Sequence, residues 1–368
     1  MEKKNFSLFT LFFSISLYIY KNYIKTMEDL NSNFRRIILH PLFNSTLEEL
    51  SKKKIKIPEH KTFPEFDFSL QTYPPNGKLV TSIGEIKSIG LDPKKGESLV
   101  NEEIILGYDE SIANYDGLEG ASYLMSHSLV IYTKDDYVPL VLLSFYFYTR
   151  AKKIVVENSN IKYSEDPNID SKNDYVKDRA TFLLNNSIPK SILLIDGPLI
   201  GGQISYHTTQ LNNQLLEKDI IPIFFVKNSR SNMVTDNSST LKENFNSDMH
   251  WAYKTLGAGQ RTNFFKYVDA YNEDFGKIFC YLKAFDVSPQ RIEFHVKTLE
   301  KYGKDKMAEI MNLIYYLNLV QGNKKDPQIR IISIAELFAK EMLKIKKIED
   351  IMDELNITPS INQSRWWD

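Results

Sequence analysis

The stretch SILLIDGPL, residues 191–199, is the segment from which the fold of this chain can be inferred. Ser191–Ile195 is a short, continuous apolar run, which is typical of a strand that is covered on both faces of a sheet. The run ends in Asp196. Thr208–Lys218 then has the pattern of a helix, and Ile221–Val226 is a second buried strand. A strand, a helix and a strand at this spacing predict a parallel crossover unit.

Three strands are predicted upstream of this unit. They are rich in branched and aromatic residues, and they span Glu103–Asp109, Tyr123–Thr133 and Val138–Thr149. The polar break Lys134–Asp136 supplies a turn between the last two, so the three strands favour an antiparallel meander. A meander followed by parallel strands predicts an α/β fold with a mixed sheet flanked by helices.

The remaining segments predict one large domain with an N-terminal arm. A helix is expected over Asp174–Asn185, and loops over 158–174 and 228–250. Two further strands and two helices are expected over Lys277–Phe285, Arg291–Val296, 303–321 and 333–348. Residues 63–100 are rich in proline and glycine and indicate a connecting arm with short strands. The predicted organisation is a leader or appended helix at 1–26, a helical and extended arm at 27–95, one α/β domain at 96–350 and a tail at 351–368.

A hydrophobic segment, Asn5–Tyr20, lies near the N-terminus. It has 16 uncharged residues, whereas a transmembrane helix needs roughly 20 apolar residues. No cleavage site with small residues follows it, which argues against a secretory signal. We therefore favour a misassigned leader, with Met27 as the true start, or an appended helix, over a membrane anchor.

Charge and cysteine content exclude several classes of protein. Lys and Arg total 46 and Asp and Glu total 47, so the formal net charge of -1 argues against a strongly basic nucleic-acid coat protein, although a local basic groove stays open. Cys280 is the single cysteine, which excludes an intramolecular disulfide and a Cys-rich zinc site. The six histidines lack the spacing of a zinc hydrolase, and no P-loop motif is present.

Two aspartates each follow an apolar strand and precede a turn. Asp109 stands in GYDES, residues 107–111, and Asp196 in IDGPL, residues 195–199. Ligands gather at the carboxyl ends of strands in α/β sheets, and converging carboxylates repel one another unless a cation such as Mg²⁺ or Mn²⁺ binds them. Two such ions about 4 Å apart can activate water and stabilise the leaving oxygen of a phosphodiester. Each aspartate alone also fits an ordinary turn, but the pair, at the ends of the first and fourth strands, favours a metal site.

With these segments the chain resembles the NurA nuclease family. The resemblance is carried by Tyr108–Ser111, by Leu193–Leu199 (LLIDGPL) and by the strand Ile221–Val226, which continues into Lys227 and Ser231. The order and spacing agree from about 100 to 235, and more loosely to about 345. The resemblance implies an RNase H-like fold, with an antiparallel meander followed by parallel strands.

The family resemblance also implies an activity and partners. Its members are archaeal and bacterial, Mn²⁺-dependent (or Mg²⁺-dependent) DNA nucleases with 5′–3′ exonuclease and single-strand endonuclease activity. They form homodimers and work with the hexameric ATPase HerA in DNA end resection and double-strand break repair. For this chain the resemblance implies a cytoplasmic enzyme that acts on DNA, by a two-metal-ion mechanism, with a HerA-like partner.

Individual residues take roles from the same resemblance. Asp109 and Asp196 match the two metal-binding aspartates, and Asp178 stands where the family has a helical glutamate; Asp174 is the second choice for that place. Lys227 would contact the scissile phosphate or neutralise developing charge, although a strand-end lysine also explains it. Further DNA contacts are expected from Arg230 and Ser231 and, as weaker candidates, Arg261 and Lys266.

The C-terminal part departs from the family pattern. Ala335 is followed by Glu336 where a histidine is expected, and Gln328 stands near the place of a tyrosine. Glu336 could ligate the metal as a carboxylate, or it could be a solvated helix residue. This departure keeps a second hypothesis open, that of a weakened or inactive DNA-binding subunit that docks on a HerA-like translocase.

Overall fold

The computed structural model describes residues 48–49 and 78–360, apart from residues 134, 135, 158, 202, 203, 323 and 326. The chain divides into two units, Met1–Pro58 and Glu59–Asp368, and the fold below belongs to the second. The hydrophobic segment Asn5–Tyr20 lies outside the described residues, so its role stays a prediction. None of the helices in the described part is long and apolar enough to span a membrane.

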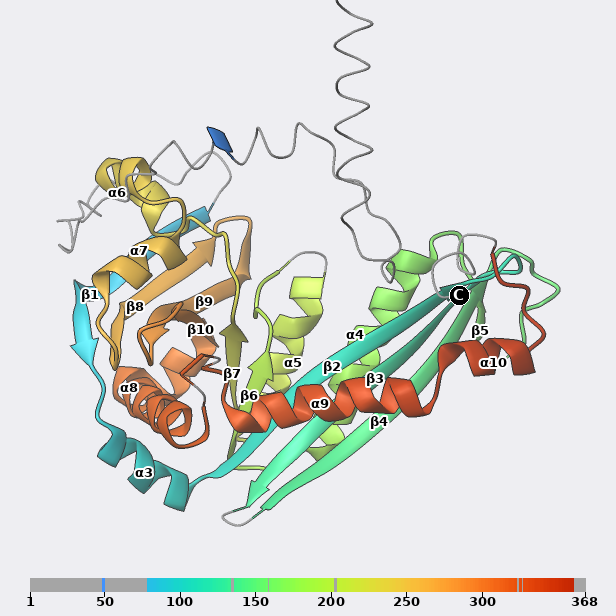
Figure 1. Cartoon of the computed structure of the whole chain (residues 1–368), viewed down its shortest axis with the longest axis horizontal. Helices are drawn as coiled ribbons and strands as arrows, with labels where there is room; N and C mark the ends of the chain where they lie inside the picture. Colours follow the sequence, from blue (N-terminus) through green and yellow to red (C-terminus); the bar gives the residue numbers. More distant parts are fainter. Residues whose placement is uncertain are drawn as a thin grey trace, which may run out of the picture. The chain divides into compact units, whose positions relative to one another are not determined.

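The core of the fold is a ten-stranded mixed sheet with the order β1-β8-β9-β10-β7-β6-β2-β3-β4-β5 (Figure 1). Its central strands are β2 (Ile104–Asp116), β3 (Ala121–Thr133), β4 (Asp136–Thr149), β6 (Ser191–Asp196) and β7 (Ile221–Val226). β2, β3 and β4 form an antiparallel meander, β6 runs parallel to β2, and β7 runs parallel to β6. This is the topology of an RNase H-like sheet, so the predicted fold class is confirmed.

A second, antiparallel half extends the sheet beyond β7. Its strands are β10 (Gln290–His295), β9 (Asn272–Lys283), β8 (Gln260–Asp269) and β1 (Lys78–Gly90). β9 and β10 correspond to predicted strands, but β8 was not predicted, and β1 lies in the segment that we expected to be an arm. β1 is an edge strand that pairs with β8 alone. Its apolar residues Val80, Ile83, Ile86 and Ile89 recur every third residue instead of alternating, and the pairing shifts register between Ile83 and Ser88, so the usual strand pattern is absent.

Helices pack on both faces of the sheet. The main ones are α4 (Pro167–Asn186), α5 (Ser205–Glu217), α8 (Val296–Gln321) and α9 (Arg330–Ile345). Ile105 and Leu194 lie in the core under α8 and α9, whereas their chain neighbours Leu106 and Leu193 lie in the core under α4 and α5. This alternation follows from the two-residue period of a strand. Odd-numbered residues of β2 therefore face α9.

The smaller elements complete the unit. They are α3 (Pro93–Glu102), β5 (Ile161–Tyr163), η2 (Thr235–Asn237), α6 (Ser239–Asn244), α7 (Asp248–Thr255) and α10 (Ile348–Glu354). The predicted loops at 158–174 and 228–250 are thus partly helical. α4 begins at Pro167 because Asp166 caps its first turn and proline suits the first helical position. The helix predicted over 303–321 is part of α8, which bends at Gly303.

A glycine allows α9 to lie directly on β2. A Cβ atom at Gly107 would come within 2.8 Å of Ile331 Cγ1 and 2.9 Å of the Ile331 carbonyl oxygen. Ile331 stands in the first turn of α9, and Gly107 stands two residues before Asp109. The absence of a side chain at Gly107 therefore sets how closely the helix approaches the strand.

We expect Gly107→Ala to lower the free energy of unfolding by roughly 1–3 kcal/mol, because the added methyl group would overpack the contact with the α9 backbone. Urea denaturation measures the change. Gly90→Ala is the matched control, since a Cβ atom at Gly90 meets nothing within 4 Å. Equal midpoints for Gly107→Ala and the wild type would contradict the close packing of α9 on β2.

Candidate metal centre

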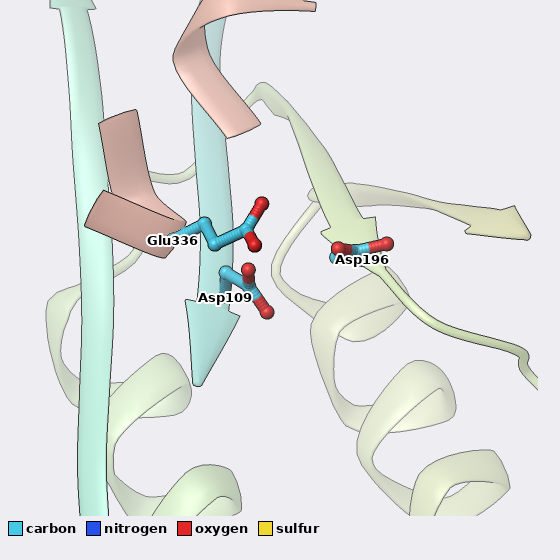
Figure 2. A group of neighbouring side chains, drawn as sticks. All are labelled: Asp109, Asp196 and Glu336. Carbon is cyan, nitrogen blue, oxygen red and sulfur yellow. The ribbon is translucent and has the colours of Figure 1, made fainter. Parts of the chain in front are cut away.

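Three carboxylates from separate parts of the chain meet on the face of the sheet that α9 covers. Asp109 stands on β2 just beyond Tyr108, the last residue that pairs with β6, and Asp196 ends β6. Glu336 stands in the second turn of α9. Each residue offers one oxygen, and these oxygens all lie within 4.8 Å of one another (Figure 2).

A lysine balances part of the negative charge of this carboxylate group. Lys227 follows β7, and its Nζ lies 2.6 Å from Asp196 Oδ2 and 3.4 Å from Glu336 Oε2. Burial lowers the pKa of Lys227, but the hydrogen bond to Asp196 and the nearby carboxylates outweigh burial, so its pKa is raised. Lys227 therefore stays protonated and holds two of the three acids together.

The three acids have different electrostatic surroundings. Asp109 is only 9% exposed. Burial, and then the charge of Asp196, raise its pKa from 3.8 to about 7. Glu336 accepts hydrogen bonds from Lys340 Nζ at 2.6 Å and Gln328 Nε2 at 3.1 Å, and with Lys227 nearby its pKa falls to about 2. In the metal-free protein, Asp109 thus keeps its proton to a higher pH than an ordinary aspartate does.

The donor set suits a hard divalent cation. All three ligand residues offer carboxylate oxygens, which Mg²⁺ and Mn²⁺ prefer, whereas zinc sites rely on sulfur and nitrogen. Burial, and next the charge of Asp196, oppose the ionisation of Asp109, so an excess of negative charge at this position is unfavourable in the absence of a cation. A cation at this position would remove that excess charge.

Asp178 and Asp174 lie elsewhere. Both stand on α4, the helix that packs on the opposite face of the sheet from α9. The Asp178 carboxylate accepts a hydrogen bond from Tyr146 Oη at 2.9 Å. Asp174 accepts from Tyr148 Oη and Lys162 Nζ, both at 2.8 Å. The structure therefore brings Asp109, Asp196 and Glu336 together but does not bring Asp178 to them.

The predicted DNA-contacting residues divide into exposed and internal ones. Arg230 is exposed. Ser231, in contrast, has its hydroxyl turned inward, 2.6 Å from Arg291 Nη1. Arg261 is buried over the ring of Phe264, so its guanidinium does not reach the surface. Lys266 is half-buried on β8.

Sequence reasoning did not assign roles to the residues that hold Glu336. Lys340 follows Glu336 at a spacing of four on one helix, a pair that the sequence alone can indicate. Gln328 precedes α9, and no spacing rule predicts that its amide reaches Glu336. Both fix the orientation of the Glu336 carboxylate toward Asp109 and Asp196.

Comparison with known proteins adds a family match. The NurA domain family matches residues 122–326. The matched segment contains Asp196 and Lys227, whereas Asp109 and Glu336 lie outside it. No curated protein matches the chain.

Several solved structures are similar to this chain at low identity. The NurA nuclease from Sulfolobus solfataricus aligns with 11% identity and a TM-score of 0.46, over 77% of this chain and 89% of that one. NurA with manganese aligns with 9% identity and a TM-score of 0.37, over 70% and 93%. Endonuclease V from Bacillus subtilis aligns with 9% identity and a TM-score of 0.36, over 68% and 84%.

The raised pKa of Asp109 predicts how the metal-free protein responds to pH. Between pH 4 and 7 the native state keeps a proton on Asp109 that the unfolded chain has released, so rising pH lowers stability across this window. Asp109→Asn removes this penalty. We expect the variant to exceed the wild type in free energy of unfolding by about 0.5–2 kcal/mol at pH 8 in the presence of a chelator, and the difference to shrink toward pH 4.

The control for this prediction is Asp116→Asn, which makes the same change at an exposed position of the same strand. Mn²⁺ should reverse the ranking of Asp109→Asn and wild type, because a cation stabilises only the protein that binds it. Parallel pH profiles for Asp109→Asn and the wild type would show that Asp109 carries no buried proton.

Proposed function

The chain belongs to the NurA domain family, a family of nucleases, and from that premise we propose that it is a metal-dependent nuclease that hydrolyses the phosphodiester bonds of DNA. The main support is the meeting of Asp109, Asp196 and Glu336, which come from three separate elements, within 4.8 Å. Three carboxylates that share only Lys227 and Lys340 as cationic partners are costly to hold together at a partly buried position. A protein that had no use for a cation would gain stability by replacing one of the acids.

Each residue of the site would have a distinct role in the reaction. Asp109, Asp196 and Glu336 would hold one or two Mn²⁺ or Mg²⁺ ions. When bound, such ions would lower the pKa of water and stabilise the charge that develops on the phosphate. Lys227 keeps its proton, so it would donate a hydrogen bond to a phosphate oxygen and orient the bond to be cleaved. Gln328 and Lys340 would keep Glu336 ionised and in position.

The finer properties of the family are part of the same proposal. We expect 5′–3′ exonuclease and single-strand endonuclease activity, a homodimer, and action in the cytoplasm with a HerA-like hexameric ATPase in end resection and double-strand break repair. A two-metal-ion mechanism is expected in that setting. The sheet topology and the family match support the nuclease, and these further properties follow from the family alone.

A second candidate function rests on Glu336, which replaces the expected histidine. If a carboxylate at this position holds the cation in a geometry that does not support hydrolysis, the protein would bind DNA or dock on a HerA-like ATPase without cleaving the DNA. This alternative predicts complex formation and a change in ATPase rate with no metal-dependent cleavage. Glu336→His, which restores the family residue, should then create cleavage that the wild type lacks.

The deciding experiment is cleavage of end-labelled single-stranded and double-stranded DNA with Mn²⁺ or Mg²⁺. We expect Asp109→Asn and Asp196→Asn each to lower the rate by about 100-fold or more, because each removes a carboxylate that holds the cation. Glu336→Gln should also lower it. Initial rates at saturating metal measure the effect.

Asp178→Asn is the discriminating comparison, since this carboxylate hydrogen-bonds to Tyr146 rather than to the group of three. It should keep most of the cleavage rate. A loss of cleavage rate as large as that of Asp109→Asn would indicate that Asp178 does bind the metal. Unchanged cleavage in both Asp109→Asn and Asp196→Asn would refute the proposed site.

A further inference from the structure

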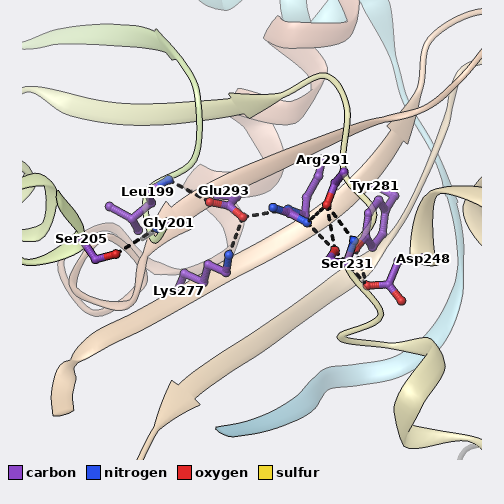
Figure 3. A network of polar contacts seen from close by, with 10 residues as sticks. Leu199, Gly201, Ser205, Ser231, Asp248, Lys277, Tyr281, Arg291 and Glu293 are labelled. Carbon is purple, nitrogen blue, oxygen red and sulfur yellow. Dashed lines mark hydrogen bonds and ion pairs between the residues drawn. The ribbon is translucent and has the colours of Figure 1, made fainter. Parts of the chain in front are cut away.

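A network of buried charged side chains joins β9 and β10 to the loops that follow β6 and β7 (Figure 3). Its centre is Glu293, which has no solvent exposure. One Glu293 oxygen accepts from Lys277 Nζ at 2.6 Å and Arg291 Nε at 2.8 Å. The other accepts from the backbone N–H of Leu199 at 2.9 Å.

The second branch of this network runs from Arg291 to the loop after β7. Arg291 Nη1 donates to Ser229 Oγ at 2.7 Å and to Ser231 Oγ at 2.6 Å. Asp248 lies beyond Ser231, at 3.4 Å, and also accepts from Tyr281 Oη at 2.8 Å. Two cations and two carboxylates therefore balance within one buried network.

Both ends of the network contact loops that begin at residues of the candidate metal centre. Leu199 stands three residues after Asp196, and Ser229 stands two residues after Lys227. Glu293 aligns with Phe224 in the sheet, so it lies on the face opposite Asp196 and Lys227. The network thus holds the loops after β6 and β7 from one face of the sheet. Asp196 and Lys227, at the start of these loops, point to the opposite face.

Stability alone is a weak explanation for such a network. A buried ion pair is often no more stable than apolar residues of the same volume, because removing charges from water costs as much as their attraction returns. Compared with apolar residues, charged and hydroxyl groups add geometric specificity, since each hydrogen bond favours one orientation of the groups that form it. The groups fixed here are the hydroxyls on either side of Arg230.

Arg230 stands between the two serines of this network. Ser229 and Ser231 both turn their hydroxyls toward Arg291, and their oxygens lie 2.9 Å apart. Arg230, between them, is exposed, and its guanidinium forms no ion pair with another residue in the described part of the chain. It stands three residues beyond Lys227, which contacts the carboxylates.

We propose that Arg291, Ser229 and Ser231 are positioning residues, which hold Arg230 outward as a phosphate contact for the strand that Lys227 and the carboxylates engage. This inference rests on the proposed nuclease function. A guanidinium suits the role because its planar fork matches phosphate oxygens. Such a contact adds affinity in a salt-dependent manner without reading the base sequence.

The test is a double-mutant cycle on cleavage of single-stranded DNA. Arg230→Ala should raise KM roughly threefold to tenfold with little change in kcat, and should reduce the salt dependence of kcat/KM by about one phosphate contact. Ser229→Ala with Ser231→Ala should raise KM by a similar factor. Arg230→Ala added to that pair should change little more, because the contact has already been lost.

Two controls separate positioning from general damage. Arg150→Ala removes another exposed arginine and should leave KM unchanged. Thermal unfolding of the serine pair should match the wild type within a few degrees. Additive effects of Arg230→Ala and the serine pair would overturn the proposal.

A readout that needs no cleavage keeps the proposal separate from the nuclease function. Cys280 is buried and is the single cysteine of the chain, so a spin label on Arg230→Cys would attach at one place. The label should be more mobile when Ser229→Ala and Ser231→Ala are also present. Equal mobility would overturn the positioning role, whereas absence of cleavage in every protein would overturn the nuclease function alone.

Discussion

The mutual repulsion of Asp109, Asp196 and Glu336 is the constraint on which the rest of this structure depends. Carboxylates this close repel one another and would move apart unless the surrounding structure held them in place. The fold prevents that movement by placing the acids on three elements that pack against one another, since β6 pairs with β2 and α9 lies on β2. Lys227 pairs with Asp196 and Lys340 pairs with Glu336, while burial and the charge of Asp196 raise the pKa of Asp109.

The arrangement of the sheet explains why these particular residues meet. β2 and β6 are parallel neighbours in register, so Asp109 and Asp196 follow the last pair, Tyr108 with Ile195, at the same level. The two-residue period turns both side chains to the same face. Gly107 then lets α9 lie close to β2, which brings Glu336 over the pair from a position 140 residues later in the chain than Asp196.

Sequence patterns predicted the parts of this arrangement that depend on local rules. Buried parallel strands are recognisable from continuous apolar runs such as Ser191–Ile195, and the aspartates that follow them could be paired by topology. β8 was not predicted although its partner β9 follows it directly in the chain, and β1 lies in the segment where only short strands were expected because its apolar residues do not alternate. Asp178 matched a family spacing, but a spacing along a helix does not say which face of the sheet the helix covers, and α4 packs away from the three acids. The roles of Glu293 and Arg291 depend on contacts between loops, which no local pattern encodes.

The length of β2 has a consequence for how such a protein can diversify. β2 runs on to Asp116, but within the described strands only β3 pairs with it after Tyr108. The carboxylates therefore lie where β6 ends and its loop leaves the sheet, while β2 and β3 continue as a two-stranded antiparallel pair. Loops on the β6 side can lengthen or change composition without disturbing that pair. The positions of the three carboxylates and the composition of these loops are thus separable, so the surface around the proposed site could change while the carboxylates are kept.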